Sequence, residues 1–61
     1  MKNKIKIERV KKSLSQKQLA NKIGISQATI SDIEKGKKGV ILSVAFKIAN
    51  FFGVKIEDLF N

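Results

Sequence analysis

The stretch Gln-Lys-Gln-Leu-Ala-Asn-Lys-Ile-Gly-Ile-Ser-Gln-Ala-Thr-Ile-Ser-Asp-Ile-Glu-Lys, residues 16–35, decides how this chain folds. It predicts two short amphipathic helices joined at Gly24, because glycine adopts the positive φ of a helix-ending turn at little cost. Ala20 is small enough to let the second helix cross closely, and Ile30 and Ile33 fill the angle between the helices. The second helix then directs four small or polar side chains outward: Gln27, Ala28, Ser31 and Asp32.

Serine residues mark the starts of both helices. Ser15 precedes a predicted helix near 16–23 and, with Gln18 three residues on, fits the capping-box pattern. Ser26 is the predicted N-cap of the next helix, near 27–35. The two serines therefore set where each helix begins.

A further helix is predicted ahead of this stretch, near residues 4–12. Asn3 is a suitable N-cap for it. Ile7, Val10 and Leu14 recur at about one-turn spacing, which predicts that they form its inner face.

The C-terminal third has the clearest helical periodicity, near 42–52, with Gly53 as its end. Because this period continues through Phe52, a strand at 40–46 is rejected. A last helical turn is predicted from Ile56, Leu59 and Phe60. The predicted fold class is thus all-α, with five short helices around one core. The apolar stripe of the fourth helix consists of Leu42, Ala45, Ile48, Ala49 and Phe52.

Length and composition restrict the possible functions. Residues 1–61 are enough for a single small domain. The chain has no Cys and no His, so disulfides, common zinc sites, thiolate nucleophiles and imidazole bases are excluded, and no cofactor is predicted. With few free carboxylates, no catalytic constellation emerges. No apolar run reaches the length of about 20 residues that spans a membrane, and no leader pattern follows Met1, so we expect a cytoplasmic protein.

The formal net charge of +8 is unevenly distributed. In residues 42–61, Lys47 and Lys55 balance Glu57 and Asp58, so the whole excess lies in residues 1–41. Such concentration favours a polyanionic partner over a role in solubility alone. A membrane surface is a weaker alternative, because the first helix lacks the aromatic-rich apolar face of an interfacial anchor.

Five segments carry a resemblance to a known family. They are Leu-Ser-Gln-Lys-Gln-Leu-Ala (14–20), Ile-Gly-Ile-Ser (23–26), Ile-Ser-Asp-Ile-Glu-Lys-Gly-Lys (30–37), Ala-Phe-Lys-Ile-Ala (45–49) and Phe-Gly-Val-Lys-Ile-Glu-Asp-Leu-Phe (52–60). In these words and their spacing the chain resembles the lambda-repressor-like (XRE, phage Cro/repressor) helix-turn-helix domains over nearly its whole length. The resemblance implies a five-helix double-stranded-DNA-binding domain of a transcriptional regulator, commonly a repressor, that acts as a dimer on a palindromic operator.

The resemblance also implies site residues. The second helix of residues 16–35 would enter the major groove, where a Gln27 amide matches adenine, Ala28 suits a thymine methyl and Asp32 could accept from cytosine. Asp32 has an alternative role, in pairing with a nearby lysine or in excluding other sequences. The implied base-reading residues are Gln27, Ala28, Ser31 and Asp32. The implied DNA-backbone contacts are Gln16, Lys17, Thr29, Lys35, Lys37 and Lys38.

Arg9 and Glu34 have a different role by resemblance. In the family, an arginine of the first helix pairs with the glutamate of this segment inside the domain. An unpaired carboxylate beside the core would be costly, which favours such a pair. We therefore assign Arg9 and Glu34 to the fold and not to DNA contact.

Two departures from the family pattern affect the second half. Gly39-Val40-Ile41 stands where the family commonly has a rigid Asn-Pro turn followed by a hydroxyl cap, which predicts a looser loop before the fourth helix. Lys55 replaces a common serine cap. Because relatives often have Arg-Gln where this chain has Gln27-Ala28, the operator sequence is not predicted.

The neutral C-terminal third leaves two questions open. Phe46 and Phe51 are either a dimer patch or part of the core. The alternative function is a protein-interaction module, such as an antitoxin or adaptor, that binds its partner through the last two helices. No small-molecule ligand and no membrane partner are predicted.

Overall fold

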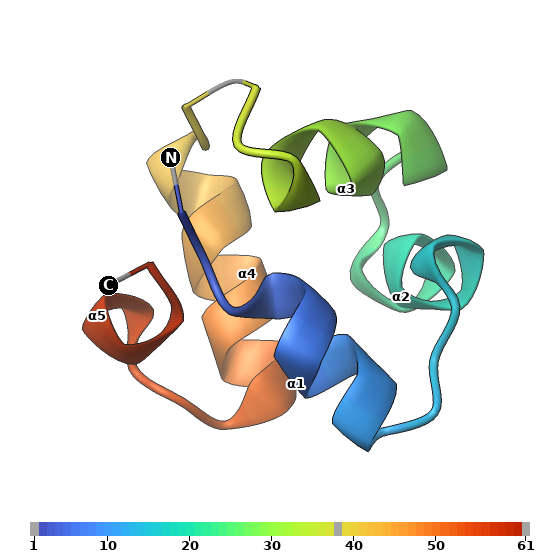
Figure 1. The fold of residues 1–61 in the computed structure, drawn as a ribbon, viewed down its shortest axis with the longest axis horizontal. Helices are drawn as coiled ribbons and strands as arrows, with labels where there is room; N and C mark the ends of the chain where they lie inside the picture. Colours follow the sequence, from blue (N-terminus) through green and yellow to red (C-terminus); the bar gives the residue numbers. More distant parts are fainter. Residues whose placement is uncertain (1, 38, 61) are drawn as a thin grey trace.

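The computed structural model describes residues 2–37 and 39–60. All regular structure in these ranges is helical, which confirms the all-α class. In Figure 1, α1 crosses in front of α4, α2 and α3 lie together on one side, and α5 lies on the other. The helices are α1 (Ile5–Lys11), α2 (Gln16–Ile23), α3 (Gln27–Glu34), α4 (Leu42–Phe52) and α5 (Ile56–Leu59).

One apolar core joins the five helices, and α4 contributes most to it. Its residues at one-turn spacing are buried because an amphipathic helix places such positions on one face. No core side chain is more than 8 % exposed. The core consists of Ile5, Leu19, Ala20, Ile30, Ile33, Ala45, Ile48, Ala49, Phe52 and Leu59.

The start of α2 and the turn between α2 and α3 have the predicted geometry. The Ser15 hydroxyl accepts a hydrogen bond from the Gln18 N–H at 3.0 Å, and the Gln18 side chain accepts one from the Ser15 N–H at 2.8 Å. Gly24 has φ 77°, and its N–H donates to the Ala20 carbonyl at 2.9 Å. Ala20 is 1 % exposed. The capping box, the left-handed glycine and the small crossing residue are therefore confirmed.

The prediction for α1 was wrong in which face it buries. Ile7 and Val10 are 55 % and 58 % exposed, whereas Ile5 and Arg9 are buried. Ile5 and Arg9 are four residues apart and thus share a face. Because Arg9 occupies one of the inner positions, counting apolar residues alone selected the wrong side of the helix.

The N-cap of α1 is Lys4, and not Asn3 as predicted. The Asn3 side chain instead connects two segments. The Asn3 Oδ1 accepts a hydrogen bond from the Ile5 N–H at 3.2 Å, and its Nδ2 donates to the Ile33 carbonyl at 2.7 Å. Asn3 thus fixes the start of α1 against the end of α3.

The start of α4 agrees with the predicted loss of a cap. Ile41 is the N-cap residue and makes no side-chain capping bond. Leu42, which the sequence places on the buried stripe, is 63 % exposed, because the first turn of α4 extends beyond the core. Lys55 likewise begins α5 without a side-chain cap.

The helix that the sequence predicts near residues 27–35 is α3, and it ends one residue earlier, at Glu34, with Lys35 as its C-cap.

Candidate nucleic-acid interface

The outward face of α3 carries the side chains that the sequence assigns to base reading. Gln27 and Ala28 are exposed in its first turn, and Ser31 and Asp32 lie half-buried one turn later. Residues four apart lie on the same face of a helix, so the structure brings these four positions together. The Ser26 hydroxyl fixes the start of this face by accepting a hydrogen bond from the Thr29 N–H at 3.1 Å.

Thr29 lies beside this face rather than on it. It is half-buried, and its hydroxyl lies 2.8 Å from the Ser26 hydroxyl. Thr29 and Asp32 also line a shallow cavity of about 210 Å³ between α3 and the loop that precedes α4, together with Val40 and Ile41. The loop therefore adjoins the outward face of α3.

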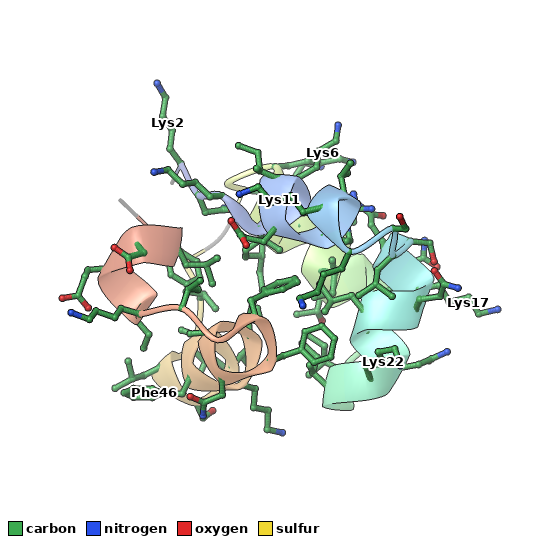
Figure 2. The ribbon with its side chains drawn as sticks, turned by 90° about the horizontal axis from the view of Figure 1, so that it is seen from below. Lys2, Lys6, Lys11, Lys17, Lys22 and Phe46 are labelled. Atoms are coloured by element: carbon green, nitrogen blue, oxygen red, sulfur yellow. The ribbon has the colours of Figure 1, made fainter. Side chains whose placement is uncertain are left out.

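Exposed lysines lie at the start of α2 and after the end of α3. Lys17 lies in the first turn of α2 and projects into solvent (Figure 2). Lys35 caps the end of α3, and Lys37 follows it in the loop; both are exposed. Lys38, which the sequence adds to this group, lies outside the described residues.

Below the outward face, Arg9 of α1 and Glu34 of α3 form an ion pair. The Arg9 Nε donates to Glu34 Oε2 at 2.7 Å, and Nη2 donates to Oε1 at 3.1 Å. The side chains are only 11 % and 5 % exposed. This is the bidentate geometry in which arginine binds a carboxylate most strongly. The pair expected from the sequence is thus present and connects two helices.

Two further hydrogen bonds extend this ion pair. The Gln16 side chain donates to Glu34 Oε1 at 3.1 Å, which ties the start of α2 to the end of α3. Arg9 Nη1 donates to the Leu14 carbonyl at 2.8 Å, which fixes the turn between α1 and α2. No local sequence pattern predicts the bond to the Leu14 carbonyl, because it depends on where Arg9 lies after α1 has packed against the core. Together, these bonds hold α3 at a fixed angle.

The ion pair shifts the pKa values of both partners. Burial on its own raises the pKa of Glu34, but the hydrogen bonds from Arg9 and Gln16 and the charge of Arg9 outweigh it and hold the pKa below its usual range. The hydrogen bond to Glu34 raises the pKa of Arg9. Both groups are therefore charged at neutral pH.

The arrangement of α2, the Gly24 turn and α3 can be compared with known proteins. Residues 5–59 match the helix-turn-helix family. The chain belongs to the lambda-repressor-like helix-turn-helix family. Helix-turn-helix proteins of this type are DNA-binding transcriptional regulators, and the family is in general not enzymatic.

Individual helix-turn-helix relatives cover nearly all of the chain. It is 58 % identical over 60 residues to an uncharacterized HTH-type transcriptional regulator of Methanocaldococcus jannaschii, which covers 98 % of this chain and 91 % of the relative. It is 40 % identical over 60 residues to the uncharacterized regulator YgzD of Bacillus subtilis, with coverages of 98 % and 91 %. A cryptic phage CTXphi transcriptional repressor of Vibrio cholerae, RstR, is 39 % identical over 57 residues, 93 % of this chain and 51 % of the repressor.

Within the helix-turn-helix framework, α2 and α3 are the two helices of the motif, and α3 is the second.

In the part of the chain that the structure describes, no three side chains of His, Cys, Asp or Glu are grouped as a metal site would require. Each described helix is also too short or too polar to cross a membrane.

Proposed function

We propose that this chain is a sequence-specific transcriptional regulator that inserts α3 into the major groove of double-stranded DNA. The observation that carries this proposal is the outward face of α3, where exposed Gln27 and Ala28 start a helix held by buried contacts and flanked by exposed lysines. The N-terminal residues of the second helix of this motif are the ones that contact base edges.

Each reading residue fits a particular base. The Gln27 amide donates and accepts at once, which matches N6 and N7 of adenine. The methyl group of Ala28 packs against the methyl group of thymine, and Asp32 accepts from N4 of cytosine. Ser31, between them, donates or accepts at either kind of base. These contacts supply specificity.

Affinity comes from the phosphates. Lys17, Lys35 and Lys37 provide positive charge around α3, and Gln16 and Thr29 add polar contacts at the starts of α2 and α3. Lys38 belongs to the same set by sequence. Because Gln16 already donates to Glu34, a phosphate contact by Gln16 would connect the DNA backbone to the helix that reads bases.

We further propose that two copies bind a palindromic operator and act as a repressor in the cytoplasm, without a cofactor, a metal or an enzymatic activity. Dimers of this motif read half-sites about one helical turn, roughly 34 Å, apart. The phage repressor among the relatives supports repression.

Selection from a random duplex library at physiological salt tests this function. We expect enrichment of one sequence in two inverted copies. Recovery of a random pool, with no enriched word, would contradict sequence-specific binding and would favour a protein-interaction role.

Replacing Gln27 with alanine is expected to remove discrimination at one base pair, by about 1–3 kcal/mol, because the paired donor and acceptor are lost. The measurement is the affinity of both proteins for four duplexes that differ only at that base pair. Gln18→Ala is not a suitable control, because the Gln18 side chain caps α2. Gln27→Glu is the matched variant, because it keeps the size of the side chain and an acceptor oxygen but loses the amide donor. Equal preferences for wild type and Gln27→Ala at every position would exclude Gln27 from base reading.

Replacing Lys37 with alanine is expected to weaken binding to all sequences alike. Loss of one phosphate contact should also reduce the slope of log affinity against log salt by about 0.9. Titrations at several salt concentrations measure both effects, with exposed Lys47→Ala of α4 as the control of equal charge. If both variants give the same slope, Lys37 makes no phosphate contact of its own.

A further inference from the structure

The outward face of α1 carries two exposed apolar side chains between two lysines. Ile7 and Val10 are 55 % and 58 % exposed and lie three residues apart. Lys6 and Val10 are four residues apart, as are Ile7 and Lys11, so the four side chains share one face of the helix. We call Lys6, Ile7, Val10 and Lys11 the α1 ridge.

The apolar residues of the α1 ridge contribute little to the fold. The opposite face of α1 supplies Ile5 to the core and Arg9 to the ion pair with Glu34. Because β-branched residues are weaker helix formers than alanine or lysine, Ile7 and Val10 gain neither burial nor helix propensity at these positions. Neighbouring apolar side chains with charged residues around them are typical of a contact surface, which has an apolar centre and a polar rim.

The charge around the α1 ridge favours an acidic partner. Glu8 is the one carboxylate in the sequence of residues 1–12, and it accepts a hydrogen bond from Lys11 at 3.4 Å. Figure 2 shows Lys2 and Lys6 projecting from the side of the molecule that lies opposite Phe46. Positive charge gathered on one side attracts an acidic surface and orients it. The exposed lysines of this segment are Lys2, Lys4, Lys6, Lys11 and Lys12.

The shape of the α1 ridge favours a helical partner. All regular structure in residues 2–37 and 39–60 is helical, so these residues offer no strand edge with which an extended segment could pair. A helix satisfies its own backbone groups and needs none from α1. Helices pack through side chains three and four residues apart, which is the spacing within the ridge. Because the seven residues of α1 span about 10 Å, the contact is small and of the transient class.

DNA and membranes match the α1 ridge less well. Phosphates pair with lysines, but contact with phosphate gives Ile7 and Val10 no favourable burial. An interfacial membrane helix has a larger apolar face than two side chains. Since α1 and α3 meet through Arg9 and Glu34, the outward faces of these helices point away from that contact. A protein bound to the α1 ridge therefore leaves the outward face of α3 uncovered.

We propose that the α1 ridge binds an acidic amphipathic helix of a partner protein. The apolar face of that helix packs on Ile7 and Val10, and carboxylates on its two sides pair with Lys6 and Lys11. This interaction is separate from the proposed recognition of DNA and can be measured without DNA.

The probe is a synthetic helical peptide with leucine at every third or fourth position and glutamate along both sides of that stripe. Its affinity is measured by fluorescence anisotropy at low and at high salt. A second peptide has the same composition in scrambled order, so it keeps the charge but lacks the apolar face. Vesicles of anionic phospholipid and duplex DNA are titrated in parallel.

Two double variants each remove one property of the α1 ridge. Ile7→Ala combined with Val10→Ala removes the apolar side chains and keeps good helix formers. Lys6→Gln combined with Lys11→Gln removes two charges and keeps long polar side chains. Circular dichroism verifies that both variants are folded.

The matched apolar control lies on α4, in the neutral part of the chain. Leu42 and Phe46 are 63 % and 51 % exposed, so Leu42→Ala combined with Phe46→Ala truncates a comparable surface. Phe51, whose role the sequence leaves open together with that of Phe46, is half-buried against the core, where its ring meets Phe52 edge to face at 5.2 Å. Phe51 is therefore left unchanged. The matched charge control is Lys22→Gln combined with Lys47→Gln, which removes two exposed charges from α2 and α4.

We expect wild type and both control variants to bind the amphipathic peptide with micromolar affinity. Loss of Ile7 and Val10 should weaken binding by about tenfold or more, because apolar surface is no longer buried. Loss of the charges of Lys6 and Lys11 should weaken binding about tenfold at low salt and much less at high salt, where exposed charges are screened. Duplex DNA should not displace the peptide.

Several results would overturn the proposal. They are no binding of the amphipathic peptide by wild type, equal affinity for the two peptides, and equal affinity in the ridge variants and their controls. Tighter binding to vesicles that depends on Ile7 and Val10 would assign the α1 ridge to a lipid surface instead. Displacement of the peptide by duplex DNA would assign the lysines of the ridge to the DNA interface. Peptide binding by a wild type that fails to select any DNA sequence would support the ridge and contradict the proposed function.

Discussion

Arg9→Ala is expected to lower the free energy of unfolding by about 3–5 kcal/mol, because it leaves the Glu34 carboxylate buried without its counterion. Glu34 is 5 % exposed on its side chain, and among the described residues it retains only the hydrogen bond from Gln16 in this variant. Small domains have stabilities of about 5–15 kcal/mol, so a large part of the stability would be lost. Denaturant titration followed by circular dichroism measures the change.

A double-mutant cycle separates the pair from its surroundings. Arg9→Ala and Glu34→Ala together should cost much less than the sum of the single changes, because each alone leaves one buried charge unpaired. Additive effects would show that the two side chains do not stabilise each other.

The same cycle has a defined pH dependence. The folded-state pKa of Glu34 is held below its usual range, so this group contributes stability above its unfolded pKa and loses it as the pH falls through the folded value. The coupling between Arg9 and Glu34 should therefore be full at neutral pH and absent in strong acid. The pair Lys11 and Glu8, exposed and 3.4 Å apart on α1, is the control and should show little coupling at any pH.

Ile30→Ala is the second large effect, with an expected loss of about 2–5 kcal/mol. Ile30 is fully buried where α3 meets α2, and truncation removes apolar contacts and leaves a cavity. Ile7→Ala is the matched control, because Ile7 is 55 % exposed and its truncation should change stability by less than about 0.5 kcal/mol.

Comparison of these two isoleucines also tests the assignment of the faces of α1. Thermal and denaturant unfolding of both variants give the two losses on one scale. Similar losses for Ile7→Ala and Ile30→Ala would mean that Ile7 is buried in solution, against the arrangement described above.

The central part of the fold could be predicted because its signals are local. Ser15, Gln18 and Gly24 act on hydrogen bonds within a few residues, and the structure has each of them in the predicted role. The buried face of α1 could not be predicted in this way. Arg9 can occupy this face because it pairs with Glu34, which lies 25 residues further along the chain. A pattern of apolar residues within one helix gives no information about so distant a partner.

The candidate site was predictable to a similar degree. The outward position of Gln27 follows from the helix that Ser26 starts, and the structure places it there. The bond between Gln16 and Glu34 depends on how α2 and α3 pack, and the sequence did not predict it, because it assigned Gln16 only to the DNA backbone. The bases that Gln27 and Asp32 contact depend on the DNA itself, and they stay predictions.

The contact between the first and last helical segments has a consequence for chain order. The Lys4 N–H donates to the Leu59 carbonyl at 2.8 Å, so the path of the backbone returns close to where it began. When the ends of a domain are adjacent, they can be joined and the chain opened elsewhere. An opening in the exposed loop at Gly39 would keep α2 and α3 contiguous. We therefore expect a chain rearranged in this way to keep the same helix packing.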